Sequence, residues 1–197
     1  IFGLYKPKSR VITTVTEHNS VLRPLFELER RGEIKLTVVA PETTMITAAD
    51  IEKNLSDDVS LVCVNGVSNV TGAENDIDGI GRLLKNTNAV FLVDGAQAAG
   101  HIPLNVESQN IDALCVPSHK GLLGIVGAGA IIVSGKRKIR PFAFGGTGFD
   151  TFSETMPEDE PESLEAGTLN LPAILSMKEG ADYLSDNIDY VSTRLKY

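Results

Sequence analysis

The sequence predicts an α/β fold with a mostly parallel β-sheet. Short runs rich in Val, Ile and Leu alternate with amphipathic stretches along most of the chain, which is the order of strands and helices in βαβ units. Several of these runs are apolar on both faces, as in strands that are covered on both sides. A length of 197 residues and a hydrophobic fraction of 42% are sufficient for one domain with a buried core.

The strands are expected at short runs of β-branched and other apolar residues. They are residues 11–16, 36–39, 61–64, 89–93, 111–116 and 130–133. After the first run, residues 20–31 place three leucines and a phenylalanine on one face of a helix. Pro24 is tolerated only near a helix start, so this helix should begin close to Asn19 or Ser20.

Three further helices are expected. Thr47 can cap a short helix, with Asp50 three residues later in the position of an imperfect capping box. Residues 76–84 form the next helix, and a last helix begins at Leu171. Residues 145–170 are rich in Gly, Thr, Pro and acidic side chains and have no period, which predicts a long irregular segment.

The acidic composition restricts the function. The chain has 26 Asp and Glu against 18 Lys and Arg, a net charge of −8, and no basic stripe, which argues against nucleic-acid binding. No apolar run approaches the length that spans a bilayer, so no membrane partner is expected. Cys63 and Cys115 lie far apart in apolar runs, which favours small core side chains in a reducing cytoplasm over a disulfide framework or a metal site.

Polar residues follow the predicted strands. In an open α/β sheet, ligands bind beyond the carboxyl ends of the strands, so residues at these positions form the candidate site. They are His18, Asn69, Asp94, Gln97, Ser118, His119 and Lys120. The third histidine, His101, lies in a connection and is expected at the surface.

Lys120 is the candidate nucleophile. It follows an apolar strand and precedes a Gly-Leu-Leu-Gly turn, where a partly desolvated pocket would make its neutral amine available to attack a carbonyl. Asp94 could keep a pyridine nitrogen protonated, as pyridoxal 5'-phosphate (PLP) requires. The alternatives are an ordinary loop lysine and a helix-capping aspartate. Asp94, Gln97 and Lys120 together are more specific than any one of them alone.

Several segments resemble those of one enzyme family. SNVTG (68–72), VDGAQ (93–97), SHKGLLG (118–124) and EAGTLN (165–170) resemble the class V aminotransferase and cysteine desulfurase family, in the same order and spacing. TEHNSVLRPL (16–25) resembles the segment with the family's ring-stacking histidine. The resemblance implies the large PLP-binding domain of fold type I, a three-layer α/β/α sandwich with a mostly parallel mixed sheet.

The resemblance also implies catalytic roles. Lys120 would form the internal aldimine with PLP and later move the proton at the substrate α-carbon. His18 would stack on the cofactor ring. Asp94 would pair with the pyridine nitrogen and so make the ring an electron sink.

The remaining site residues would bind the cofactor in the same family pattern. Asn69 and Gln97 would lie near the phenolic oxygen of the ring. Ser118 and His119 would hold the phosphate. Thr168 would reach the phosphate of the neighbouring subunit in a homodimer. No metal is implied.

The implied function is that of a cysteine desulfurase or selenocysteine lyase. Its substrate would be cysteine or selenocysteine, and a sulfur-acceptor protein would be a further partner. The alternatives are another class V aminotransferase or β-lyase, or a folded or partner-binding module without catalysis. A Schiff-base aldolase would also use a lysine, but it explains neither Asp94 nor His18.

Some features of the family pattern are different or missing. Ile125-Val126 follows the GLLG turn where proline is common, and Gly95 replaces the usual alanine, but both changes spare the side chains with chemical roles. The family's phosphate-cradling turn, carboxylate-binding arginine and mobile cysteine are not found. We therefore expect residues 1–184 to be a large PLP-binding domain, incomplete at its N-terminus, and residues 185–197 to start a connection to a further domain. Alone, this chain is expected to show little or no turnover.

Overall fold

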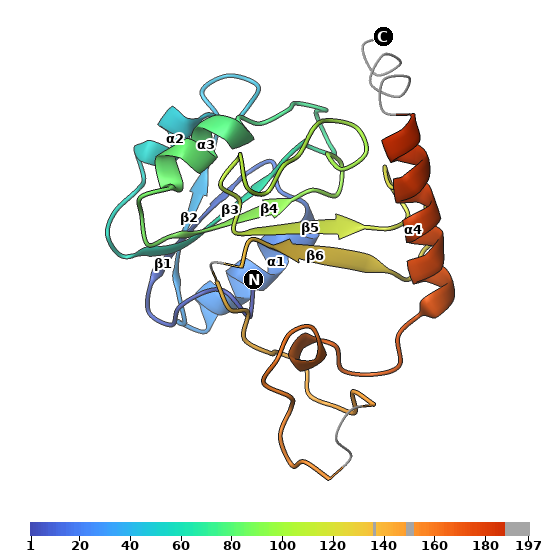
Figure 1. Ribbon diagram of the computed structural model, residues 1–197. Coiled ribbons are helices and arrows are strands. Elements are labelled where there is room, and N and C mark those ends of the chain that lie inside the picture. The colour runs from blue at the N-terminus through green and yellow to red at the C-terminus, as the bar shows by residue number, and fades with distance from the viewer. Residues whose placement is uncertain (136, 149–151, 188–197) are drawn as a thin grey trace.

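A six-stranded sheet forms the centre of the molecule (Figure 1). The computed structural model describes residues 1–135, 137–148 and 152–187. The strands, in chain order, are β1 (Arg10–Thr14), β2 (Lys35–Val39), β3 (Val59–Asn65), β4 (Val90–Asp94), β5 (Ala113–Pro117) and β6 (Gly129–Val133). Their order across the sheet is β2-β1-β3-β4-β5-β6; β6 pairs antiparallel with β5, and the other pairs are parallel. The predicted mostly parallel mixed sheet is confirmed.

Helices lie on both faces of this sheet, which gives three layers (Figure 1). The helices are α1 (Asn19–Arg30), α2 (Ala48–Glu52), α3 (Ile77–Leu84) and α4 (Leu171–Asp186), with one 3-10 turn at Glu162–Leu164. α1 packs on one face, and α2 and α3 pack on the other. The predicted three-layer α/β/α sandwich is therefore confirmed, and the element boundaries differ from the expected ones by only a few residues.

The core consists of two clusters, one on each face of the sheet, because successive side chains of a strand point to opposite faces. In β3, Leu61 and Cys63 belong to the cluster beneath α1, whereas Val62 and Val64 belong to the cluster beneath α2 and α3. All seven residues of β3 are buried, as expected for a central strand with helices on both faces.

Local capping determines where the helices begin. The Thr47 side chain accepts a hydrogen bond from the Asp50 backbone N–H, and the Asp50 carboxylate accepts one from the Thr47 backbone N–H. The capping box expected at this position is thus formed in full. His18 caps α1, which begins at Asn19, close to the start that Pro24 predicted.

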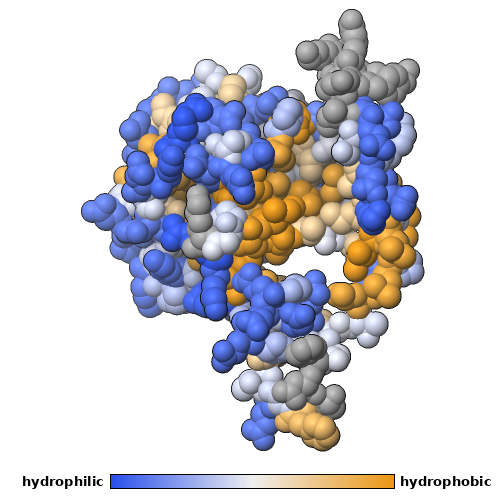
Figure 2. Space-filling view, in the orientation of Figure 1, coloured by the Kyte–Doolittle hydropathy of each residue, from blue (hydrophilic) through white to orange (hydrophobic). Residues whose placement is uncertain are grey.

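The β6 side of the sheet is less covered than the centre. Ile131 and Ile132 are 54% and 40% exposed, so coverage on both faces does not extend to this edge strand within the described part of the chain. Leu171 and Leu175 at the start of α4 are also exposed, and Figure 2 shows apolar surface gathered on and beside this helix. Met177 on the same helix packs against the core cluster beneath α2 and α3.

The expected domain boundary after residue 184 falls within the last turn of α4, which continues to Asp186. Residues 188–197 lie outside the described residues. The division into residues 1–184 and 185–197 therefore stays a prediction.

The packing of β4 gives a direct test of this core. Phe91 is fully buried, so Phe91→Ala should lower the free energy of unfolding by about 3–5 kcal/mol, because it removes apolar contacts and leaves a cavity. Phe152 is 97% exposed, and Phe152→Ala should change the same quantity by less than about 0.5 kcal/mol. Denaturant unfolding followed by circular dichroism measures both. Equal effects of the two substitutions would contradict the placement of Phe91 in the core.

Candidate functional site

The candidate site lies where three parallel strands end. Asn65 of β3 pairs in register with Asp94 of β4, and Asp94 pairs with Cys115 of β5. Hydrogen bonds continue this register beyond the strands, from Gly66 N to Asp94 O at 2.9 Å and from Gly95 N to Cys115 O at 2.8 Å. The turns after these strands therefore leave the sheet side by side, at the edge where α/β proteins bind ligands.

The turn after β5 contains Ser118, His119 and Lys120. It is closed by hydrogen bonds from Gly124 N to Ser118 O and from Leu123 N to Lys120 O, both 2.9 Å long. The Lys120 side chain is half-buried and makes no hydrogen bond or ion pair with the described residues, while His119 is exposed. Ser118 is fully buried, and its Oγ has no hydrogen-bond partner there either.

The turn after β4 presents Asp94 and Gln97, both half-buried. Asp94 Oδ1 accepts a hydrogen bond from the Ala96 N–H at 2.9 Å, which is the capping role considered as an alternative for this residue. That bond uses one carboxylate oxygen. Oδ2 makes no hydrogen bond within the described part of the chain, so capping leaves an acceptor available for a ligand.

The turn after β1 contains His18. Its Nδ1 accepts a hydrogen bond from the Ser20 N–H at 3.1 Å and lies 2.9 Å from Ser20 Oγ. Because Nδ1 is an acceptor, the proton of the neutral ring is on Nε2. The side chain is exposed at the same edge of the sheet.

Asn69 and Thr168 are exposed and make no hydrogen bond to the other predicted site residues within the described ranges. Asn69 is exposed in the turn after β3, where the Ser68 hydroxyl accepts from two backbone N–H groups. Thr168 is exposed in the segment before α4. No hydrogen bond joins either side chain to the rest of the candidate site within the described ranges.

Glu17 is a buried carboxyl group that the sequence did not single out. It is 6% exposed, and its Oε1 accepts hydrogen bonds from Thr14 Oγ1 at 2.7 Å and from the Asn65 N–H at 2.8 Å. Oε2 is buried and has no partner among the described residues. Burial raises the pKa of Glu17 to about 7, and the nearby charge of Asp94 adds to the increase. A charged residue beside threonines and a histidine is usually exposed, so the sequence contains no signal for this burial.

A polar network extends from Glu17 across the sheet edge. The Asn75 side chain donates to Asn65 Oδ1 at 2.6 Å and to Asn65 O at 2.8 Å, and its own Oδ1 accepts from the Ile46 N–H. These bonds join the loops after β2 and β3 to the end of β3. Asn65 in turn donates from its side chain to Thr16 O at 2.5 Å and from its backbone to Glu17 Oε1, which holds the turn that contains His18 beside the end of β3.

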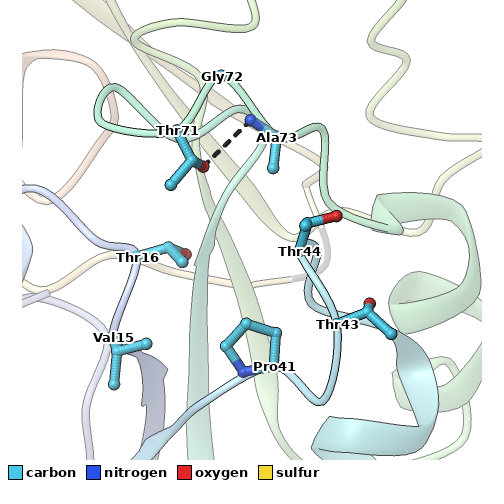
Figure 3. A pocket seen from close by; sticks show the side chains of 8 residues that line it. All are labelled: Val15, Thr16, Pro41, Thr43, Thr44, Thr71, Gly72 and Ala73. Carbon is cyan, nitrogen blue, oxygen red and sulfur yellow. Dashed lines mark hydrogen bonds between the residues drawn. The ribbon is translucent and has the colours of Figure 1, made fainter.

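A pocket lies next to this network, at the ends of β1, β2 and β3. It is lined by Val15, Thr16, Pro41, Thr43, Thr44, Thr71, Gly72 and Ala73 (Figure 3). The Thr16 hydroxyl also lies 3.4 Å from Asn65 Oδ1, so Thr16 both lines the pocket and contacts the network. None of the residues predicted for the site lines this pocket, which is on the β2 side of the candidate site.

The two cysteines occupy core positions, as predicted. Cys63 is fully buried in β3, and Cys115 is half-buried in β5. Burial raises the pKa of both thiols, which disfavours the reactive thiolate. The His101 side chain, which is expected at the surface, is only partly exposed.

A family model for the class V aminotransferases matches residues 2–195. The chain belongs to the class V aminotransferase family. Its curated relatives include a probable cysteine desulfurase of Borreliella burgdorferi, 32% identical over 193 residues, and the cysteine desulfurase IscS of Shewanella woodyi, 34% identical over 194 residues. These alignments cover 93% and 97% of this chain but 45% of each relative. The chain thus spans about half the length of the curated relatives it matches.

Solved structures of class V relatives have the same fold. The apo structure of a cysteine desulfurase from Thermococcus onnurineus NA1 matches with a TM-score of 0.84 and 29% identity, over 94% of this chain and 48% of that one. DndA from Streptomyces lividans matches with a TM-score of 0.77 and 26% identity, over 91% of this chain and 48% of that one. The sheet and helices described above are therefore those of a fold type I α/β protein.

Membership of the class V family implies PLP, and the residues at the sheet edge fit this cofactor. PLP offers an aldehyde, a pyridine nitrogen and a phosphate. Considering only the described residues, the turns after β4 and β5 offer a lysine amine without a partner, a carboxylate with a free oxygen, and a buried hydroxyl without a partner at Ser118. The donor set thus matches the chemistry of the cofactor.

The described ranges contain neither a membrane-spanning helix nor a metal-binding cluster. No helix there is long and apolar enough to cross a membrane. No group of three or more His, Cys, Asp or Glu side chains in the same ranges could hold a metal ion.

The buried carboxyl of Glu17 predicts a pH dependence of stability. Below about pH 4.5 the folded and unfolded chains both hold the proton, and above about pH 7 neither holds it. Between these values only the folded chain keeps it, so stability falls as the pH rises through this window. A shift from 4.5 to about 7 corresponds to about 3 kcal/mol. Glu17→Gln should remove this contribution, because an amide does not ionise.

Urea unfolding at pH 4.5 and pH 7.5 measures the effect. The stability of the Glu17→Gln variant relative to the wild type should rise by up to about 3 kcal/mol between these two pH values. Glu107 is exposed, and Glu107→Gln is the matched control that should keep the wild-type pH slope. An unchanged slope in Glu17→Gln would show that Glu17 titrates like a solvated carboxyl.

Proposed function

We propose that this chain supplies the PLP-binding face of a cysteine desulfurase, with cysteine or selenocysteine as substrate. The observation that supports this most strongly is the placement of Lys120 and Asp94. A half-buried amine and a carboxylate oxygen, neither of them bonded to any other residue that the structure describes, lie at the ends of neighbouring strands that pair in register. The similarity to proteins named cysteine desulfurase supports this choice over other class V activities.

When bound, PLP supplies an electron sink for bonds at the substrate α-carbon. Lys120 would hold the cofactor through its amine and would later accept and return the proton at the substrate α-carbon. Asp94 would keep the pyridine nitrogen protonated by accepting its hydrogen bond. His18 would lie against the ring, because its side chain is exposed at the same edge.

The other site residues would orient the cofactor. Asn69 and Gln97 would lie near the phenolic oxygen, where amide groups can donate hydrogen bonds. Ser118 and His119 would hold the phosphate, since an imidazole and a hydroxyl that is not bonded to any described residue are suitable donors to an anion. Thr168 would donate to the phosphate of a second subunit, which makes a homodimer part of the proposal.

The proposal extends to partners and location. A desulfurase passes sulfur to an acceptor, so we include a sulfur-acceptor protein among the partners. The two cysteines, unpaired and set in the core, suit the reducing cytoplasm. Residues 1–184 would form the large PLP-binding domain.

The test of Lys120 uses PLP itself. The wild-type chain mixed with PLP should develop a visible absorption band, and borohydride reduction should make the attachment permanent on the peptide that contains Lys120. Lys120→Ala should lose both signals, because no amine remains at this position. Lys35 is exposed on the far edge strand, and Lys35→Ala is the control that should keep both. No band in the wild-type chain, or attachment at another lysine, would refute the proposal.

The role of Asp94 is tested by Asp94→Asn. Asparagine keeps the acceptor for the Ala96 N–H, so the melting temperature of the free chain should stay close to that of the wild type. PLP affinity should fall by about tenfold or more, because a hydrogen bond to a charged group contributes about 1.5–3 kcal/mol. Titration followed by the visible band measures the affinity. An unchanged affinity would assign Asp94 to capping alone.

A further inference from the structure

The turns after β4 and β5 are in direct backbone contact. A Cβ atom added to Gly121 would lie 2.0 Å from Ala99 O, and one added to Gly100 would lie 2.2 Å from Gly121 O. Real Cβ atoms essentially never approach that closely, so only glycine fits at either position. The turn that presents Gln97 and the turn that presents Lys120 therefore pack together without side chains between them.

His101 lies at this junction and is half-buried. Its Nδ1 is 3.0 Å from the backbone oxygen of Gln97. A carbonyl oxygen only accepts, so Nδ1 carries the proton and donates. Two atoms of the ring, Cε1 and Nδ1, lie 2.8 and 2.9 Å from the position that a Cβ of Gly121 would occupy. The ring thus contacts the backbone at Gln97 and at the residue next to Lys120.

The Lys120 side chain is half-buried, and no polar contact with the described residues fixes its amine. Its position relative to Asp94 therefore depends on where the backbone of its turn is held. One side of that turn packs against α4, where a Cβ at Gly180 would lie 2.0 Å from Leu122 O. The other side packs against the turn that ends at His101.

We propose that His101 is a positioning residue, which holds the Lys120 turn against the Gln97 turn and so keeps the amine aligned with Asp94. This inference rests on the proposed function, because it concerns the lysine that would bind PLP. The imidazole acts through the backbone and does not touch the cofactor. Its hydrogen bond fixes the ring to one turn, and its Cε1 and Nδ1 atoms, which lie against Gly121, limit the movement of the other.

The test compares two substitutions at His101. His101→Ala removes both the hydrogen bond and the ring. His101→Asn keeps a side-chain N–H that can donate to Gln97 O. Ile102 is the half-buried neighbour on the same connection, and Ile102→Ala is the control for general loss of stability. Melting temperatures of all variants are measured without PLP.

The first readout is the rate at which PLP attaches to Lys120, trapped by borohydride. His101→Ala should slow attachment about tenfold, because a small displacement of a reacting group is sufficient for such a loss. His101→Asn should restore the rate to within about threefold of the wild type. Ile102→Ala should lower the melting temperature and leave the rate unchanged. An unchanged rate in His101→Ala, or an equal decrease in Ile102→Ala, would overturn the inference.

The second readout is hydrogen exchange in the free chain, which does not depend on PLP. The amides of Leu123 and Gly124, which donate to Lys120 O and Ser118 O, should exchange about tenfold faster in His101→Ala and at nearly the wild-type rate in His101→Asn. Unchanged exchange in His101→Ala would refute the positioning role. If the wild-type chain failed to attach PLP while this exchange pattern held, the proposed function would fail and the structural role of His101 would stand.

Discussion

The parallel register of β3, β4 and β5 brings the candidate site together. Asn65, Asp94 and Cys115 stand in one row, and the backbone hydrogen bonds beyond them keep the following turns in the same order. A shift of one residue in this register would turn every side chain to the opposite face. It would also separate the Asp94 carboxylate from the turn that contains Lys120. In β3, Leu61 and Cys63 pack beneath α1, and Val62 and Val64 pack beneath α2 and α3. A shift would exchange these side chains between two differently packed clusters, so the core and the site depend on the same pairing.

Buried polar groups complete this arrangement at the end of β1. Glu17 and Asn65 form bonds that no apolar residue could replace, and Asn75 extends them to the loop after β2. Burial and the nearby charge of Asp94 raise the pKa of Glu17 to about 7, so its carboxyl keeps a proton at pH values where a solvated glutamate has lost it. Two carboxyl groups at one sheet edge therefore have different environments. Asp94 is partly solvated and bonded to a backbone N–H, whereas Glu17 is enclosed.

On the other side of the site, close backbone packing holds the turn that contains Lys120 in place. The turn with Lys120 lies between α4 and the turn that ends at His101, and glycines are required at the points of contact. The amine itself makes no hydrogen bond or ion pair with the residues that the structure describes. A nucleophile needs a backbone that is held in position and a reactive group that is not already hydrogen-bonded. The Lys120 turn meets both requirements within the described part of the chain.

Local sequence patterns are sufficient to predict the order of strands and helices, the mostly parallel sheet, the capping box at Thr47 and the residues that follow each strand. These features depend on local patterns: apolar periodicity, proline and glycine positions, and short capping motifs. The motifs around Lys120 and Asp94 also identified the family, because their order along the chain is itself the signal. The roles of the individual site residues stay predictions.

Three features depend on tertiary contacts and could not be predicted from local patterns. The tertiary structure buried Glu17, whose sequence neighbours are typical of an exposed turn, because Asn65 from another strand supplies its hydrogen bond. It placed His101 between two turns, since residue 101 meets Gly121 only after β4 and β5 have paired. It left β6 with exposed isoleucines, although their sequence resembles that of the buried strands. Each outcome depends on contacts between residues far apart in the chain, which local patterns do not encode.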